Sequence, residues 1–113
     1  MAKRDVEKYL KYTYRVQWSE KDREHVGLCA EFPSLSWLAL KADEALRGIV
    51  KLVREAVDDM VKSKEPVPEP MSLQQFSGKI LVRVPPEQHR ALAIEAAEQK
   101  VSMNRLISRK LSA

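Results

Sequence analysis

The sequence predicts an α+β protein built from two small units, and three observations carry this prediction. Apolar residues alternate with polar ones in three short runs before residue 41, which is typical of strands. Apolar residues then recur every three or four positions over residues 41–62, as in a long amphipathic helix. Pro66, Pro68 and Pro70 follow, and such a run separates units. A chain of 113 residues can bury only a modest core, which disfavours an enzyme with a roomy pocket.

The three runs predict a small antiparallel sheet. Residues 12–18 and 26–32 form two strands joined by a polar hairpin, and residues 35–40 form a short third strand after Pro33. The apolar faces of the first two strands comprise Tyr12, Tyr14, Val16 and Trp18, and Val26, Leu28, Ala30 and Phe32.

The helix predicted over residues 41–62 carries an apolar stripe that should cover one face of this sheet. Asp43 and Glu44 favour its amino-terminal end, and Lys62 favours its carboxyl-terminal end, because these charges oppose the helix dipole. The stripe consists of Leu46, Ile49, Val53, Ala56 or Val57, and Met60.

The alternate prolines of residues 65–70 predict a semi-rigid, extended spacer that takes no part in a core. Residues 71–76 continue it. The expected organisation is therefore a front domain at residues 1–64, a linker at 65–76 and a tail domain at 77–113.

The tail begins with an isolated strand. Ile80, Val82 and Val84 alternate with Lys79, Leu81 and Arg83, as in a half-buried strand that ends at Pro85. Helices are expected at residues 87–99 and, capped by Ser102, from there to Leu111. A unit of this size is too small to fold alone and has no metal or disulfide, so we expect it to pair with a second copy of itself.

Charge divides unequally between the two parts. Residues 1–76 hold 13 basic and 13 acidic residues, whereas residues 77–113 hold seven basic residues against three acidic ones. This asymmetry favours a polyanionic partner for the tail, and a solvated helical surface is the alternative interpretation.

Catalytic and metal sites are not expected. Cys29 is the only cysteine, and His25 and His89 fall in different domains without the neighbours that zinc or general-base chemistry needs. No cofactor is expected, and neither a membrane span nor a secretion signal is visible, which indicates a cytoplasmic protein.

Residues 77–113 resemble the ribbon-helix-helix family of DNA-binding proteins. The resemblance implies that the strands of two chains pair into a ribbon that enters the major groove of double-stranded operator DNA. Lys79, Leu81 and Arg83 would then face bases, and the turn at Ser102, Met103, Asn104 and Arg105 would hold a phosphate. The family often has glycine where this chain has Lys100 and Val101. The dimer core would comprise Ile80, Val82, Val84, Leu92, Leu106 and Ile107.

Residues 12–60, followed by the linker and the tail, resemble the HicB family of bacterial antitoxins. The residues that carry this resemblance are the strand ending in Phe32-Pro33, the helix start at Asp43-Glu44-Ala45-Leu46, and the tail signatures Phe76-Ser77-Gly78-Lys79 and Arg83-Val84-Pro85-Pro86-Glu87. The resemblance implies a partial ribonuclease H-like front domain. No carboxylates stand at matching strand positions to hold Mg²⁺, so nuclease activity is not expected.

This resemblance also implies a mechanism. The front domain would bind a small basic HicA-like toxin that cleaves mRNA, and the dimeric tail, which could pair further into a tetramer, would repress the promoter. Possible toxin-facing acids are Glu20, Asp22, Glu24 and Glu31. The alternative is a stand-alone repressor whose front domain senses a ligand or only oligomerises.

Overall fold

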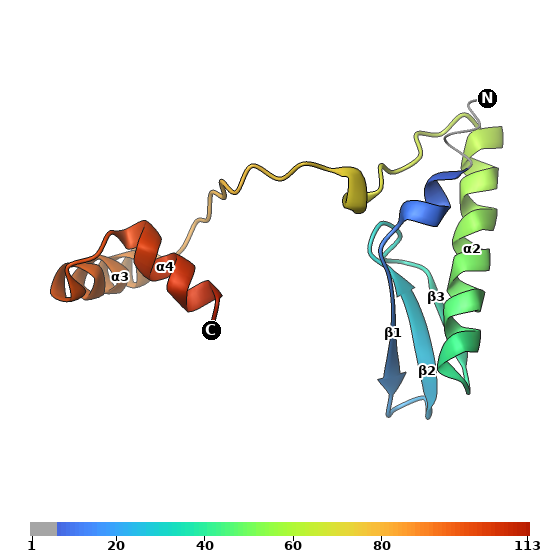
Figure 1. Cartoon of the computed structure of the whole chain (residues 1–113), viewed down its shortest axis with the longest axis horizontal. Coiled ribbons are helices and arrows are strands. Elements are labelled where there is room, and N and C mark those ends of the chain that lie inside the picture. Colours follow the sequence, from blue (N-terminus) through green and yellow to red (C-terminus); the bar gives the residue numbers. More distant parts are fainter. Residues whose placement is uncertain (1–6) are drawn as a thin grey trace. The chain divides into compact units, whose positions relative to one another are not determined.

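The computed structural model describes residues 7–113, so the first six residues of the predicted front domain lie outside the described part. The chain divides into two compact units, Met1–Phe76 and Ser77–Ala113. The first contains η1 (Glu7–Lys11), β1 (Tyr14–Ser19), β2 (Glu24–Cys29), β3 (Ser36–Ala39), α2 (Ala42–Lys62) and η2 (Met71–Leu73). The second contains α3 (Pro86–Gln99) and α4 (Met103–Leu111). Figure 1 shows all of these elements.

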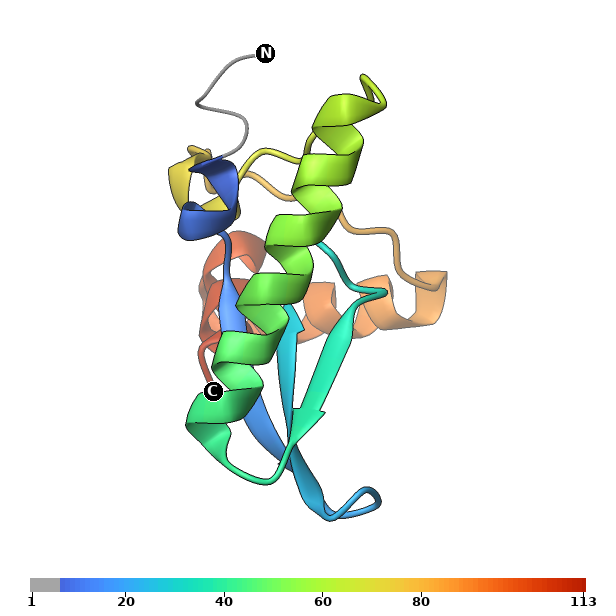
Figure 2. The same ribbon diagram turned by 90° about the vertical axis from the view of Figure 1, so that its right-hand side faces the viewer.

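The front unit is a three-stranded antiparallel sheet with the order β1-β2-β3, covered on one face by α2 (Figure 2). This confirms the α+β class, with the strands and the long helix within a few residues of their predicted bounds. No helix in residues 7–113 is both long enough and apolar enough to cross a bilayer.

The core of the front unit lies between α2 and the sheet. Ile49, Val53 and Val57 are fully buried on one stripe of α2, and Tyr12 and Cys29 join them from the strand side. The predicted stripe is displaced at its first turn, where Ala45 is buried and Leu46 is 43% exposed.

The apolar face predicted for β2 is wrong. Gly27 and Cys29 are buried against α2, whereas Val26 and Leu28 point to the opposite side and are only partly covered. The reason is a close approach of helix and sheet, because a Cβ at Gly27 would collide with the carbonyl oxygen of Ala45 and with Ile49. Glycine at this position therefore lets α2 lie directly on the strand.

A second glycine serves the same packing. A Cβ at Gly48 would overlap the indole of Trp37, so the indole packs against α2 at a position that has no side chain. Gly27 and Trp37 are direct neighbours in the β2-β3 register. The two glycines and the indole thus set the distance between α2 and the sheet.

The linker was predicted to take no part in a core, and this is wrong for Val67 and Pro70. Val67 packs against the core of the front unit, and Pro70 is buried. The hydroxyl of Tyr12 donates to the carbonyl of Pro68 at 2.8 Å, and the hydroxyl of Ser72 donates to that of Lys11 at 2.6 Å. Alternate prolines keep the chain extended, but here the extended chain lies on the protein instead of spanning solvent.

In the tail unit, the two helices have the predicted bounds within one residue, and residues 79–85 form no strand (Figure 1). A strand is defined by hydrogen bonds to a neighbour. The segment is extended, but within this single chain it has no second strand to pair with.

Candidate dimerisation and nucleic-acid interface

The turn between α3 and α4 sets the geometry of the tail. Lys100 ends α3 in the left-handed conformation, with φ of 57° and ψ of 42°, and the amide of Val101 donates to the carbonyl of Ala96 at 3.1 Å. This is the position at which helices usually have glycine. Lys100 therefore takes the conformation that glycine usually takes at this position, and the turn keeps its form without glycine.

Ser102 caps α4 as predicted, because its side-chain oxygen accepts from the amide of Arg105 at 3.1 Å. The Arg105 amide is thus already paired, and a phosphate at this helix start would be held mainly by the amides of Met103 and Asn104.

The core shared by α3 and α4 is very small. Across residues 77–113, all of which are described, only Ala96 and Leu106 are buried, while Leu92, Met103 and Ile107 are partly covered. An ion pair between Lys110 and Glu95 at 3.1 Å links the two helices at the surface. A core of this size gives little hydrophobic stabilisation to a unit on its own.

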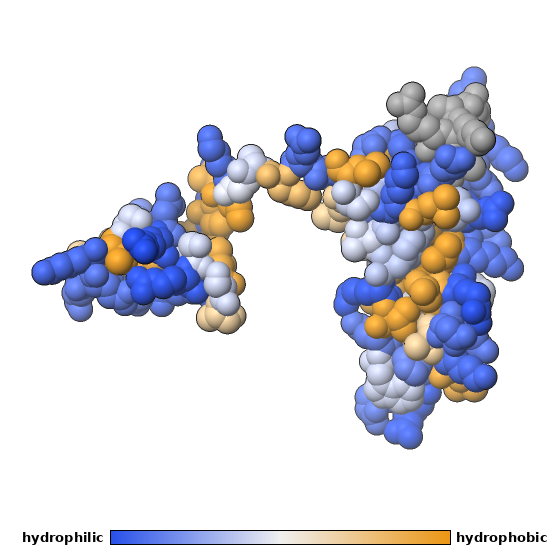
Figure 3. Space-filling model, in the orientation of Figure 1, coloured by the Kyte–Doolittle hydropathy of each residue, from blue (hydrophilic) through white to orange (hydrophobic). Residues whose placement is uncertain are grey.

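The segment that precedes α3 exposes a run of large apolar side chains. Ile80 is 78% exposed, Leu81 87%, Val82 67% and Val84 37%. Figure 3 shows apolar surface along this segment and at the neighbouring helix ends. Isolated apolar side chains on a surface are common, but a contiguous run of this kind marks an interaction site.

Two hollows lie between this segment and the helices. The first has a volume of about 590 Å³ and is lined by Gly78, Lys79, Ile80, Asn104, Ile107, Ser108, Leu111 and Ser112. The second has a volume of about 680 Å³ and is lined by Val82, Arg83, Val84, Gln88, His89, Leu92, Met103, Ile107, Lys110 and Leu111.

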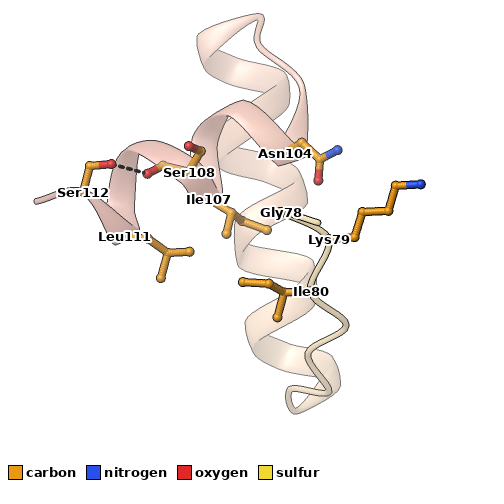
Figure 4. Close-up of a pocket in the computed structure, with 8 residues that line it drawn as sticks. All are labelled: Gly78, Lys79, Ile80, Asn104, Ile107, Ser108, Leu111 and Ser112. Carbon is orange, nitrogen blue, oxygen red and sulfur yellow. Dashed lines mark hydrogen bonds between the residues drawn. The ribbon is translucent and has the colours of Figure 1, made fainter. Parts of the chain in front are cut away.

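Residues of both alternating sets line these hollows, since Lys79 and Arg83 do so as well as Ile80, Val82 and Val84. The side chain of Ile80 points toward Ile107 and Leu111, whereas that of Lys79 points away (Figure 4). Val82 and Val84 line the second hollow, and Leu81 lines neither.

The structure therefore brings five of the six predicted dimer-core residues to these hollows. Those five are Ile80, Val82, Val84, Leu92 and Ile107, while Leu106 is buried inside the unit. Arg83, predicted to face bases, also lines the second hollow in the single chain. Leu111 was interpreted only as the end of a helix, yet it lines both hollows and is 74% exposed. Its spacing of four from Ile107 could have placed it on the same helix face.

The four predicted toxin-facing acids have different environments. Glu20 accepts from the Trp18 indole at 2.7 Å and from Arg23 at 2.8 Å, and Asp22 accepts from Ser19 at 2.8 Å, all at the exposed β1-β2 hairpin. Glu24 begins β2 and is half-buried.

Glu31 is occupied within the front unit. Its carboxylate accepts from the amides of Thr13 at 2.9 Å and Met71 at 2.8 Å. Partial burial alone would raise the pKa of Glu31, but these amides hold the pKa below its ordinary value.

The side chains of Cys29 and His25 both take part in packing within the front unit. Burial, which disfavours the thiolate, raises the pKa of the Cys29 thiol to about 11. His25 packs edge-on against Trp18 and lies 3.2 Å from the carbonyl oxygen of Leu40 through Nδ1. Residues 7–113 contain no cluster of three acids, histidines or cysteines that could hold a metal ion.

The geometry thus defines a two-unit α+β chain whose small tail leaves an apolar face uncovered. The model of the HicB family matches residues 63–111, which comprise the linker and most of the tail unit. This match supports membership of the HicB family, although it covers less than half of the chain. No curated protein and no solved structure matches the sequence.

Proposed function

We propose that this protein is the antitoxin of a HicA/HicB-type pair, which binds an mRNA-cleaving toxin and represses its own promoter as a ribbon-helix-helix dimer. It would act in the cytoplasm and have no catalytic activity of its own. The observation that carries the proposal is the exposed apolar segment at residues 80–84, together with the family match over the tail.

A second copy of the tail is the partner that fits this segment. An extended chain with unpaired backbone groups is completed by an identical chain running antiparallel, because a two-fold axis places the same residues opposite each other. Ile80, Val82 and Val84 would then meet their counterparts over α3 and α4, and Leu111 would help to close both hollows.

The opposite side of the same ribbon would face DNA. Lys79 and Arg83 can donate to guanine O6 and N7, and Leu81 can contact a thymine methyl group. The positive balance of the tail favours binding to the phosphate backbone, and the start of α4 would add a phosphate contact.

The front unit would supply the surface for the toxin. The acids at the β1-β2 hairpin, Glu20 and Asp22, are exposed and suit a basic partner. Glu31 is the weakest of the four candidates, because its carboxylate already binds two amides of its own chain.

Co-expression with a short basic reading frame beside this gene tests the proposed pairing. Growth should be arrested by that frame alone and restored by this protein, and the two proteins should purify together. If growth is not restored and no complex forms, the antitoxin proposal is wrong.

The DNA-binding half has a separate test. Arg83→Ala should weaken binding to the promoter by about 1–3 kcal/mol and relax the preference at one base pair. Arg90→Ala is a matched control, because it removes a charge from α3 outside the proposed reading face. Equal losses in both variants would contradict base readout by the ribbon.

The stand-alone repressor is the second candidate, and the exposed tail segment supports it equally. In that case promoter binding would persist, and no neighbouring frame would be toxic or bind the front unit. The co-expression experiment therefore separates the two functions.

A further inference from the structure

The residues that join the two units form a docked element instead of a free linker. We call residues 67–73 the strap. Its last turn, η2, lies beside η1 of the front unit (Figure 2). Val67 and Pro70 lie against or within the front unit, as described above, and the remaining strap residues are more exposed.

Four polar contacts hold the strap, three of them from residues 8–12 and one from Glu31. Tyr12 donates to the carbonyl of Pro68, Lys8 pairs with Glu69, Glu31 accepts from the amide of Met71, and Ser72 donates to the carbonyl of Lys11. The contacts fall on consecutive strap residues from 68 to 72 except for the buried Pro70. Each strap residue in this stretch is therefore held individually.

Glu31 is the contact that couples the strap to the sheet. The same carboxylate accepts from the Met71 amide and from the amide and hydroxyl of Thr13, immediately before β1. An amide bonded to a carboxylate is held more strongly than one bonded to a neutral oxygen. Among these four contacts, Glu31 is the group that bonds both the strap and the residue before β1. Loss of its side chain therefore removes this link.

We propose that the strap is a latch closed by Glu31, which sets the length of the free tether between the two units. With the strap docked, the tether starts after Leu73, and with the strap released, it starts after Lys64. Release adds nine residues of chain, or roughly 30 Å of maximum reach. The docking of the strap does not depend on the proposed function. Its use does rest on that function: a docked strap would limit how far a toxin-binding unit can move from a DNA-bound tail.

Hydrogen exchange of the full chain in the absence of DNA and of any partner tests the latch. In Glu31→Ala, the Met71 amide should exchange about ten- to hundred-fold faster, while the amides of Ile49 and Val53 in α2 keep their rates. Glu24→Ala is the matched control and should leave the Met71 amide unchanged. Unaltered exchange at Met71 in Glu31→Ala, or an equal increase throughout α2, would overturn the latch.

Chymotrypsin gives a second readout with an internal reference. Bonds after Met71 and Leu73 should become cleavable in Glu31→Ala and in Tyr12→Phe, which removes the contact to Pro68 and keeps the ring. Phe76 lies outside the strap and is 71% exposed, so the bond after it should be cut at the same rate in every variant. If the bonds after Met71 and Leu73 are cut as fast in the unaltered chain as that after Phe76, the strap is not docked. Since neither assay contains DNA or toxin, failure of the latch and failure of the antitoxin proposal are distinguishable.

Discussion

Val82→Ser measures whether a second copy buries the exposed segment. Val82 is 67% exposed in the single chain. Full burial of a valine side chain contributes about 1.5–3 kcal/mol, so covering the exposed two thirds contributes about 1–2 kcal/mol per chain. Both copies lose this burial in a symmetric dimer, so the total loss is about 2–4 kcal/mol. The dissociation constant of the dimer should rise by about 30- to 700-fold.

Sedimentation equilibrium over a wide range of protein concentration gives this constant directly. Leu81→Ser is the matched control, because Leu81 is adjacent, is 87% exposed and lines neither hollow. It should leave the dimer constant within about threefold and weaken promoter binding instead. If the two variants weaken the dimer equally, or if neither does, the alternation of the segment does not describe the interface.

Three further predictions concern stability, each measured by denaturant or thermal unfolding. Gly27→Ala should lower the free energy of unfolding by about 1–3 kcal/mol, because the added methyl collides with the backbone of Ala45, and a neutral effect would show that α2 can move away. Lys100→Gly should raise the free energy of unfolding by about 0.5–1 kcal/mol, because relief of the left-handed backbone outweighs the added freedom of the unfolded chain. A loss of stability would contradict this. The stabilisation from Glu31 should be fully present above its unfolded pKa, which is near 4.5, and should be lost as the pH falls through its lower folded pKa. Glu31→Gln should lack this part of the acid response, and an identical acid profile would contradict it.

The elements of the fold follow largely from local sequence patterns. The helices at residues 42–62, 86–99 and 103–111 lie within one residue of their predicted bounds, and Ser102 caps the last of them by accepting from the Arg105 amide. These features depend on residues within one or two turns of each other, so they can be read without tertiary contacts.

The sheet face and the linker could not be read in this way, because both depend on distant residues. Gly27 and Cys29 carry less apolar surface than Val26 and Leu28, and they face the core because α2 requires a close approach at Gly27. The Glu31 carboxylate binds Met71, which lies 40 residues along the chain, and no local pattern indicates that pairing.

The candidate interface stays a prediction, and the sequence signal for it is local. The alternation of residues 79–84 predicts a strand that needs a partner chain, and in the single chain Ile80, Val82 and Val84 line the hollows together with Lys79 and Arg83. The place of Leu111 at both hollows was not predicted, because an exposed leucine at the end of a helix is common and does not by itself indicate an interface.

We propose above that the tail is half of a symmetric DNA-binding dimer. The most direct test is the mass of the full-length protein, alone and on promoter DNA, by sedimentation equilibrium at micromolar concentration. We predict a particle of twice the chain mass that binds DNA as a dimer or as a pair of dimers. A particle with the mass of a single chain, which binds DNA in that form or not at all, would contradict the account.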